Sequence, residues 1–237
     1  MQTTKPRKGY KSVKIINSKR WNEKAERWEK YFEYEIPEEW EVNELGKIAN
    51  VNPLRPKNMK WDEDIPTSFI PMSSINEDLG IIETIEKRKY SEISKGYTYI
   101  QENDVIFAKI TPCMENGKCT IATNLLNEFA FGSTEFHVIR DSERINNNFI
   151  YQIFRQEKIR RKAKNSFTGT AGQQRVPPLF IEKLFVFLPP IPEQKAIAEI
   201  LSNVDEKIQK EELHKSSLEK LKKGLMQQLL TGKIRVK

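Results

Sequence analysis

The longest regular pattern of apolar positions lies near the C-terminus. Apolar residues recur three and four positions apart through residues 191–232, the spacing of one face of an α-helix. Pro189, Pro190 and Pro192 end whatever strand precedes the pattern, and Gly232 suits the C′ position of a helix. The pattern predicts a helix roughly 55–60 Å long, which a single domain of this size covers only in part. The stripe, interrupted near Glu211 and Lys215, consists of Ile197, Leu201, Val204, Ile208, Leu218, Leu221, Leu225 and Leu229.

Short apolar runs rich in Ile, Val, Thr and aromatic residues fill the middle of the chain. They lie at 68–72, 80–85, 97–100, 104–110, 118–123 and 135–140, and polar or glycine-containing breaks such as 131–133 separate them. This pattern predicts a twisted, mainly antiparallel sheet with long loops. Helical spacing returns over 147–164, and 184–188 is expected to be the last strand. The predicted fold class is therefore α+β, with a long C-terminal helix that either packs on its own domain or pairs with a partner.

The N-terminal part is polar and basic. Residues 1–35 form an extension in which Trp21, Ala25, Trp28 and Phe32 fall on one face of a possible short helix. Residues 36–40 turn into the domain proper, and 52–56 form a loop. The core positions expected next are Trp40, Val42, Leu45, Ile48 and Val51.

Charge narrows the class of partner. The 237 residues carry 40 Lys and Arg against 33 Asp and Glu, a net charge of +7, which favours a polyanion. No run of 18 apolar residues is long enough for a membrane span, and the N-terminus lacks the apolar segment of a secretory signal. Cys113 and Cys119 do not form a metal quartet with the distant His137 and His214. Reduced thiols in a cytoplasmic protein without a metal site are expected.

Catalytic motifs are missing from the sequence. There is no NPP- or DPP-aromatic motif of an amino-methyltransferase, no glycine-rich phosphate loop and no G-x-S-x-G nucleophile elbow. Carboxylate-x-lysine triplets occur at Glu193–Lys195 and Asp205–Lys207, but both lie on the predicted helix and are expected to be solvated. The sequence therefore favours binding over catalysis.

Three polar segments could contact nucleic acid. ITPCMENGK at 110–118 reads as a strand running into an Asn-Gly turn, FGSTEFHVIR at 131–140 as a strand entrance, and FTGTAGQQR at 167–175 as a loop. Amides and hydroxyls suit base edges, and a basic cluster at 160–164 suits phosphates, although a plain turn and a solvated basic helix end remain alternatives. The candidate DNA-binding residues are Lys109, Thr111, Glu115, Asn116, Lys118, Ser133, Thr134, Arg160, Arg161, Lys162, Lys164, Thr168, Gly169, Thr170, Gln173, Gln174 and Arg175.

Several stretches resemble one family. LPPIPEQKAIAEIL at 188–201 and LKKGLMQQLLTGKI at 221–234 resemble the helical spacer of DNA-specificity subunits of Type I restriction-modification systems. The three polar segments and EIPEEWEVNELGKIANV at 35–51 resemble the target-recognition domain of the same family. The resemblance covers about residues 36–232. It implies a recognition domain at 36–190, a coiled-coil spacer helix at 191–232 and a short basic tail at 233–237.

The resemblance also implies partners. Family members usually carry two recognition domains and two spacer helices, whereas this chain has one of each, so a homodimer through the helix is expected. The chain itself would catalyse nothing and would bind no cofactor. It would read double-stranded DNA and position methyltransferase and restriction subunits, which use S-adenosylmethionine, ATP and Mg²⁺. A stand-alone nucleic-acid-binding module and a decoy subunit that sequesters partners remain alternatives.

Overall fold

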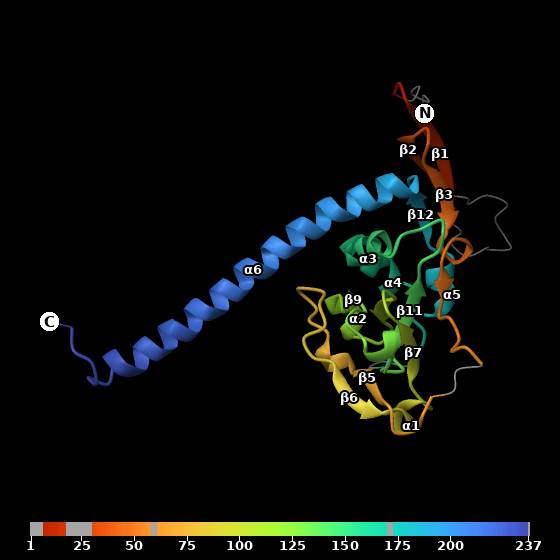
Figure 1. The fold of residues 1–237 in the computed structure, drawn as a ribbon. Helices are drawn as coiled ribbons and strands as arrows, with labels where there is room; N and C mark the ends of the chain where they lie inside the picture. The colour runs from red at the N-terminus through yellow and green to blue at the C-terminus, as the bar shows by residue number, and fades with distance from the viewer. Residues whose placement is uncertain (1–6, 18–29, 58–60, 170–172, 237) are drawn as a thin grey trace.

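The computed structural model describes residues 7–17, 30–57, 61–169 and 173–236. A globular α+β unit carries a single long helix that projects away from it (Figure 1). This arrangement confirms the predicted fold class. Among the described helices, none is both long enough and apolar enough to cross a lipid bilayer.

Two four-stranded sheets form the globular unit. One has the order β6-β5-β10-β7 and the other the order β4-β11-β8-β9. Among the described pairings of these sheets only β5 with β10 is parallel, which confirms a mainly antiparallel fold. The strands are β4 (Asn50–Val51), β5 (Pro66–Ile70), β6 (Glu86–Lys89), β7 (Thr98–Gln101), β8 (Val105–Ala108), β9 (Cys119–Ile121), β10 (Phe129–Gly132) and β11 (Phe136–Arg140).

Two local strand predictions were wrong. Residues 131–133 were expected to be a break, but Phe131 and Gly132 belong to β10, a central strand with both neighbours paired. A Cβ on Gly132 would lie 3.0 Å from the Ile70 carbonyl oxygen, so glycine here allows close packing and does not mark a turn. Residues 80–85 form only an isolated bridge, and the strand forms instead at the charged β6. β6 is an edge strand, where charged residues are common.

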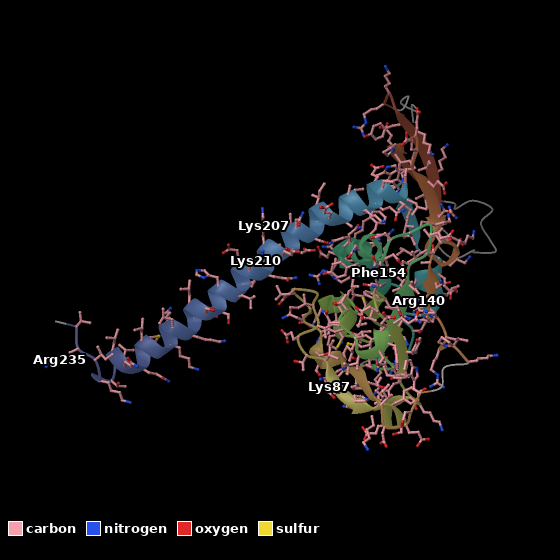
Figure 2. The ribbon with its side chains drawn as sticks, viewed as in Figure 1. Lys87, Arg140, Phe154, Lys207, Lys210 and Arg235 are labelled. Carbon is pink, nitrogen blue, oxygen red and sulfur yellow. The ribbon has the colours of Figure 1, made fainter. Side chains whose placement is uncertain are left out.

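Helices cover the second sheet. α3 (Asn147–Arg155) and α4 (Glu157–Lys164) confirm the helical prediction for 147–164 and meet at Gln156, whose extended backbone separates them. The Asn146 side chain caps α3 by accepting hydrogen bonds from the backbone of residues 148 and 149. Phe154 lies within the globular unit (Figure 2), with its ring 4.9 Å from that of Phe107 on β8. The short helices are α1 (Tyr90–Ile93), α2 (Cys113–Asn116), α5 (Pro178–Glu182), η1 (Leu45–Lys47), η2 (Met72–Ser74) and η3 (Leu126–Glu128).

The N-terminal segment differs from the predicted helix. β1 (Tyr10–Asn17) and β2 (Lys30–Pro37) form an antiparallel hairpin. Phe32 therefore lies in a strand, and the rest of the predicted helix falls outside the described residues. β2 also crosses the expected boundary between residues 35 and 36. In the core after it, Leu45 and Ile48 are buried as predicted, but Trp40, Val42 and Val51 are only half-buried.

A small sheet joins the hairpin region to the long helix. β3 (Glu41–Glu44) pairs with β12 (Phe185–Leu188), which confirms the last strand predicted at 184–188. α6 (Ile191–Leu229) follows directly, as predicted, with Pro192 and Glu193 in its first turn. Gly232 has the left-handed conformation (φ 72°) but lies two residues beyond the C-cap residue Leu230. The predicted C′ position was therefore wrong by one residue.

Only the first turns of α6 pack on the globular unit. The Gln194 side chain is fully buried and hydrogen-bonds to the backbone of Asn146, Arg144 and Pro189. Ile197 packs against the core, and Gln152 donates a hydrogen bond to Asp205. Ile197 was expected on the pairing face, but it fixes the helix to its own domain. Beyond these first turns the helix projects from the globular unit, with Lys207 and Lys210 along it and Arg235 near its far end (Figure 2).

Candidate nucleic-acid interface

Three segments that are distant in sequence meet where β8 ends. The Lys109 backbone amide donates to the Glu135 carbonyl oxygen (2.7 Å), and the Thr111 amide donates to the Gln174 carbonyl oxygen (3.1 Å). The Val176 amide donates to the Lys109 carbonyl oxygen (3.0 Å). Residues 109–118, 133–135, 168–169 and 173–175 therefore lie together, and we call this group the three-segment site.

The first segment is not the Asn-Gly hairpin turn that the sequence predicts. A cis peptide bond joins Thr111 and Pro112, one turn of α-helix (α2) follows, and Gly117 closes it with φ 94°. The Thr111 hydroxyl donates to the Glu115 carboxylate. Lys164 lies 2.5 Å from that carboxylate and, together with Thr111, lowers the pKa of Glu115. The segment is thus a compact helical turn fastened to the end of α4.

The third segment is closed by an ion pair. The Arg175 guanidinium contacts both carboxylate oxygens of Glu135 at 2.8–3.1 Å and donates to the Gln173 carbonyl oxygen at 3.1 Å. This contact lowers the pKa of Glu135 and raises that of Arg175. Thr168 and Arg175 also exchange backbone hydrogen bonds of 3.0 and 2.9 Å. The backbones of Thr168 and Arg175 are therefore held side by side, and Thr170 lies outside the described residues.

Glycine is required in this loop. Gly169 has φ 111°, a conformation that side chains disfavour. A Cβ at this position would lie 2.9 Å from the Gln173 carbonyl oxygen. The backbone at Gly169 therefore leaves no room for a side chain. Its Thr168 and Gln173 side chains are exposed, whereas Gln174 is half-buried and contributes its carbonyl group to the site.

The second segment lies between the other two. Lys109 extends its ammonium group to the Thr134 carbonyl oxygen (2.8 Å), and burial lowers the pKa of this lysine. The Ser133 hydroxyl accepts a hydrogen bond from the Glu135 amide at 3.2 Å. Thr134 is exposed between them. Lys109 and Ser133 therefore shape the site from beneath, while Thr134 faces outward.

The basic residues of the cluster at 160–164 are not all exposed. Arg160 turns inward, donating to the Arg155 carbonyl oxygen (2.6 Å) and lying against Gly117. Arg161 forms an exposed ion pair with Glu157 one turn away. Lys162 is exposed and forms no ion pair with any described residue, although partial burial lowers its pKa. Only part of the cluster predicted to contact phosphates is therefore presented to solvent.

Two further candidate residues form hydrogen bonds to other parts of the protein. Lys118 donates to the carbonyl oxygens of Met72 (3.1 Å) and Ile75 (2.9 Å), so its charge is held inside the molecule. Asn116 is exposed but donates to Glu77 (3.1 Å). Arg155, which was not among the candidates, fixes the same region by donating to the carbonyl oxygens of Glu77 (2.7 Å) and Gly117 (3.3 Å). Lys118 was predicted to contact DNA from its place in the 110–118 turn, and in the structure its ammonium group hydrogen-bonds to the backbone of the same protein.

A buried histidine supports the site from the sheet. His137 on β11 is fully buried, and its Nε2 donates to the Val176 carbonyl oxygen at 2.8 Å. Its Nδ1 lies 3.1 Å from the Asn52 amide nitrogen, which acts as donor to the neutral ring. Burial lowers the pKa of His137 to about 4. Both ring nitrogens of His137 therefore have partners within the fold, and no local signal in the sequence marked Asn52 as one of them.

The described residues offer little for catalysis. They contain no cluster of three His, Cys, Asp or Glu side chains arranged to hold a metal ion. Cys113 and Cys119 are free thiols, and burial raises the pKa of Cys119 to about 12. Its thiolate is therefore scarce at neutral pH. Hydroxyls, amides and cations dominate the three-segment site, and these groups suit hydrogen bonding to a polyanion.

Comparison with known proteins places the chain in a family. Residues 37–222 match the model of the Type I restriction modification DNA specificity domain. The chain belongs to this family. It is 37% identical over 165 residues to the Type I restriction enzyme EcoAI specificity subunit of Escherichia coli, and 36% identical over 172 residues to the EcoEI specificity subunit of the same organism. These alignments cover 69% and 72% of this chain but 28% of each relative.

Solved structures share the fold. The HsdS subunit from Thermoanaerobacter tengcongensis superposes with a TM-score of 0.62 at 21% identity, over 82% of this chain and 49% of that one. A chain from a structure of complex assembly and conformational transition of the type I R-M system gives a TM-score of 0.63, also at 21% identity, over 85% and 51%. The present chain therefore spans about half the length of these solved chains and less of the curated E. coli relatives.

Proposed function

We propose that this chain is a sequence-specific DNA-recognition subunit of a Type I restriction-modification complex, with one recognition unit that reads a short half-site in the major groove. The observation that carries the proposal is the three-segment site. Exposed Thr134, Thr168 and Gln173 lie on a backbone framework held by Arg175 and Glu135. Exposed hydroxyl and amide groups on a rigid frame suit base edges.

Positioning and reading are carried by different residues. Arg161, Lys162 and Lys164 on α4 bind phosphates, because exposed cations supply sequence-independent affinity. The surface ion pairs of Arg161 and Lys164 are weak enough to exchange for phosphate contacts. Gln173 and Thr134 supply the discrimination between bases. Arg160, Lys118 and Lys109 act beneath the surface and hold its shape.

The subunit acts through partners and catalyses no step. Residues 36–190 form the recognition domain and 191–232 the spacer helix, with the N-terminal hairpin as an addition and 233–237 as a basic tail. The methyltransferase and restriction subunits dock on this frame, and they hold S-adenosylmethionine, ATP and Mg²⁺. The methylation and cleavage chemistry therefore belongs to those subunits.

A second copy of the chain completes the assembly through α6. The helix leaves its own domain after the first turns, and its outer part exposes apolar side chains that include Leu201 (42% exposed), Leu218 (51%) and Leu225 (45%). An exposed apolar stripe of this length marks an interaction surface. A homodimer would present two identical recognition domains, so its target would be two inverted half-sites separated by a spacer.

DNA binding and partner capture test this proposal together. Fluorescence anisotropy with labelled duplex DNA measures affinity, and size-exclusion chromatography with light scattering measures capture of the methyltransferase subunit of its own system. The proposal predicts salt-dependent duplex binding and a stable complex with that subunit. A protein that binds neither duplex DNA nor the methyltransferase subunit would contradict it. Capture without DNA binding would favour a decoy subunit.

A further inference from the structure

The N-terminal hairpin borders an open groove. Figure 1 shows β1 and β2 beside β12 and the first turns of α6. Between β1 and the small sheet of β3 and β12 lies a groove of about 600 Å³, which we call the hairpin groove. β1 precedes the residues 37–222 that match the family model, so the groove forms where an added element meets the family fold. Its lining consists of Lys11, Val13, Lys14, Ile15, Trp40, Glu41, Val42, Asn43 and Phe185.

The floor of the hairpin groove is apolar. Val42 lies opposite Phe187 in the pairing of β3 with β12, and Phe185 is two residues from Phe187, so these three side chains share one face. The Tyr34 ring of β2 packs on Phe187 at a centroid distance of 5.1 Å and covers part of this face. Phe185 nevertheless remains 41% exposed, and Val13 opposite Tyr34 is half-buried. An occupant with apolar side chains would therefore bury surface that the hairpin leaves open.

The outer edge of β1 carries backbone groups that can accept a further strand. Among the described strands β1 pairs with β2 alone, and the Glu38 amide donates to the Gly9 carbonyl oxygen (3.1 Å) where this pairing begins. Residue pairs of an antiparallel ladder alternate between those that exchange hydrogen bonds and those whose backbone groups point outward. Counted from Gly9, the N–H and C=O groups of Val13 point toward β2, and those of Ser12 and Lys14 point to the outer edge.

Charge along β1 is of one sign. Lys14 is exposed and forms no ion pair with any described residue. Glu41, the carboxylate in the lining of the groove, is already paired with Arg144 at 2.7 Å. The groove therefore combines an apolar floor, an open strand edge and a positive wall. The described residues 7–15 contain no carboxylate, and their cations are Arg7, Lys8, Lys11 and Lys14.

We propose that the hairpin groove binds an extended segment of a partner protein that alternates acidic and apolar residues and pairs with β1 as an added strand. Alternate side chains of a strand point to opposite faces. The apolar side chains of the segment then lie over Val42 and Phe185, and its acidic side chains lie beside Lys14, which is on the face opposite to Val13. Backbone hydrogen bonds at Ser12 and Lys14 supply affinity, and the alternating surroundings supply specificity. This site goes beyond the proposed function and depends neither on DNA reading nor on the pairing of α6.

Two other occupants fit the groove less well. A strand that pairs with β1 meets Lys14 first, whereas a broad DNA duplex over the hairpin also meets the exposed carboxylates of Glu33 and Glu35. Phosphates gain nothing from an apolar floor or an open strand edge. A second copy that pairs edge to edge through β1 brings cations against cations, which opposes association. The observations therefore favour an acidic, apolar segment of another protein.

Peptide binding tests the chemistry of the occupant. The probe is a fluorescein-labelled peptide that alternates glutamate and valine, and its control peptide has lysine in place of each glutamate. Fluorescence anisotropy with the full chain is expected to show saturable binding of the glutamate peptide and none of the lysine peptide. Lys14→Gln should raise the dissociation constant about threefold, because an exposed ion pair is lost. Lys87→Gln on the charged edge strand β6, away from the hairpin, is the matched control and should leave the constant unchanged (Figure 2).

Hydrogen exchange tests the pairing with β1. Bound glutamate peptide should slow the exchange of the Ser12 and Lys14 amides and leave that of the Val13 amide, which faces β2, unchanged. Lys14→Pro removes the outward donor as well as the charge, so it should raise the dissociation constant on the order of tenfold or more. An unchanged exchange rate of Val13 in the free variant shows that the hairpin is intact. If proline disturbs the hairpin, the wild-type exchange pattern and Lys14→Gln decide the question.

Several results would overturn the inference. The glutamate peptide would fail to bind, or both peptides would bind equally well. Binding without slower exchange of the Ser12 and Lys14 amides would exclude an added strand. Duplex DNA that displaces the peptide and slows the exchange of the same amides would assign β1 to nucleic acid instead. Selective binding of the glutamate peptide with protection of these two amides supports the proposal, whether or not the chain reads DNA sequence.

Discussion

Arg175 holds both carboxylate oxygens of Glu135 at 2.8–3.1 Å, and this contact joins the segment at 173–175 to the entrance of β11. The planar guanidinium matches the carboxylate with two parallel hydrogen bonds, a geometry that lysine does not provide. Arg175 was expected to contact DNA directly. In the structure its guanidinium is engaged within the fold, so we propose that it positions Thr168 and Gln173.

Glu135→Gln should therefore loosen the loop without unfolding the domain. The neutral amide no longer pairs with Arg175, and we expect faster hydrogen exchange at the Thr168 and Arg175 amides. Discrimination between target and random duplex should fall on the order of tenfold. Glu157→Gln removes the carboxylate from the comparable pair with Arg161 on the helix surface and should leave the exchange of these amides unchanged. Equal effects of the two variants would contradict a positioning role for Glu135.

Gln173→Ala should change base preference more than overall affinity. The side chain is exposed on the loop, and a well-placed amide contributes about 1–3 kcal/mol of discrimination at one base pair. Binding of single-base variants of the target, measured by anisotropy, should show relaxed preference at one position of each half-site. A uniform loss of affinity across all sequences would assign Gln173 to backbone contact.

Arg161→Gln combined with Lys162→Gln should weaken binding to every sequence. Each phosphate contact releases condensed counterions, so the slope of log affinity against log salt should fall by roughly two. The matched control combines Lys207→Gln with Lys210→Gln. It removes the same charge from the part of α6 that projects beyond the globular unit (Figure 2). A change in base preference from the Arg161 and Lys162 pair, without a change in salt slope, would contradict this assignment.

The buried His137 should make the domain sensitive to acid. Its pKa is about 4 in the folded state, below the ordinary value of 6.5. Between these values the unfolded chain binds a proton that the folded chain excludes, so stability is full above pH 6.5 and is lost as the pH falls. The loss should reach about 3 kcal/mol near pH 4.

Urea unfolding at a series of pH values measures this loss. His137→Gln removes the titrating group, so its unfolding free energy should depend less on pH than that of wild type across pH 4–6.5. NMR titration of the His137 imidazole checks the cause directly. An ordinary pKa for His137 in the folded protein would refute the explanation.

The two ends of α6 should respond differently to truncated side chains. Ile197→Ala removes the contact between the first turns of α6 and the core, so we expect the globular unit to lose about 1–3 kcal/mol of stability. Leu225 is exposed on the part of α6 that projects from the globular unit. Leu225→Ala should therefore weaken dimerisation while the stability of the monomer stays unchanged. Thermal unfolding below and above the dimer dissociation constant distinguishes the two. An equal loss of monomer stability in both variants would contradict the conclusion that only the first turns of α6 pack on the globular unit.

Local periodicity was enough to predict the longer helices of the domain and its C-terminal helix. The spacing of apolar residues placed α3, α4 and α6 correctly, because an amphipathic helix is recorded in residues three and four apart. Strands were less predictable. The sequence at β10 suggests a break because Gly132 ends a short apolar run. Its need for glycine arises from Ile70 and Ile100, which lie on the neighbouring strands β5 and β7 of the same sheet. β6 carries four charged or polar residues, which only an edge position explains.

The candidate site was predictable as segments and not as individual contacts. Polar residues in short loops drew attention to 109–118, 133–134 and 168–175, and the structure brings the described residues of these segments together. The directions of Lys118 and Arg160 could not be predicted, because their partners are carbonyl groups supplied by η2 and by the end of α3. Likewise, Ile197 is part of the periodic stripe, and only the packing of α6 on the core separates it from the exposed positions.

Selection from a pool of random duplexes tests the central claim most directly. The purified chain, alone and with its methyltransferase subunit, is allowed to bind the pool, and the retained sequences are read after several rounds. We expect enrichment of one short motif that occurs twice in inverted orientation with a fixed spacer. A pool that stays random under both conditions, while the protein remains folded, would contradict the proposal that this chain reads DNA sequence.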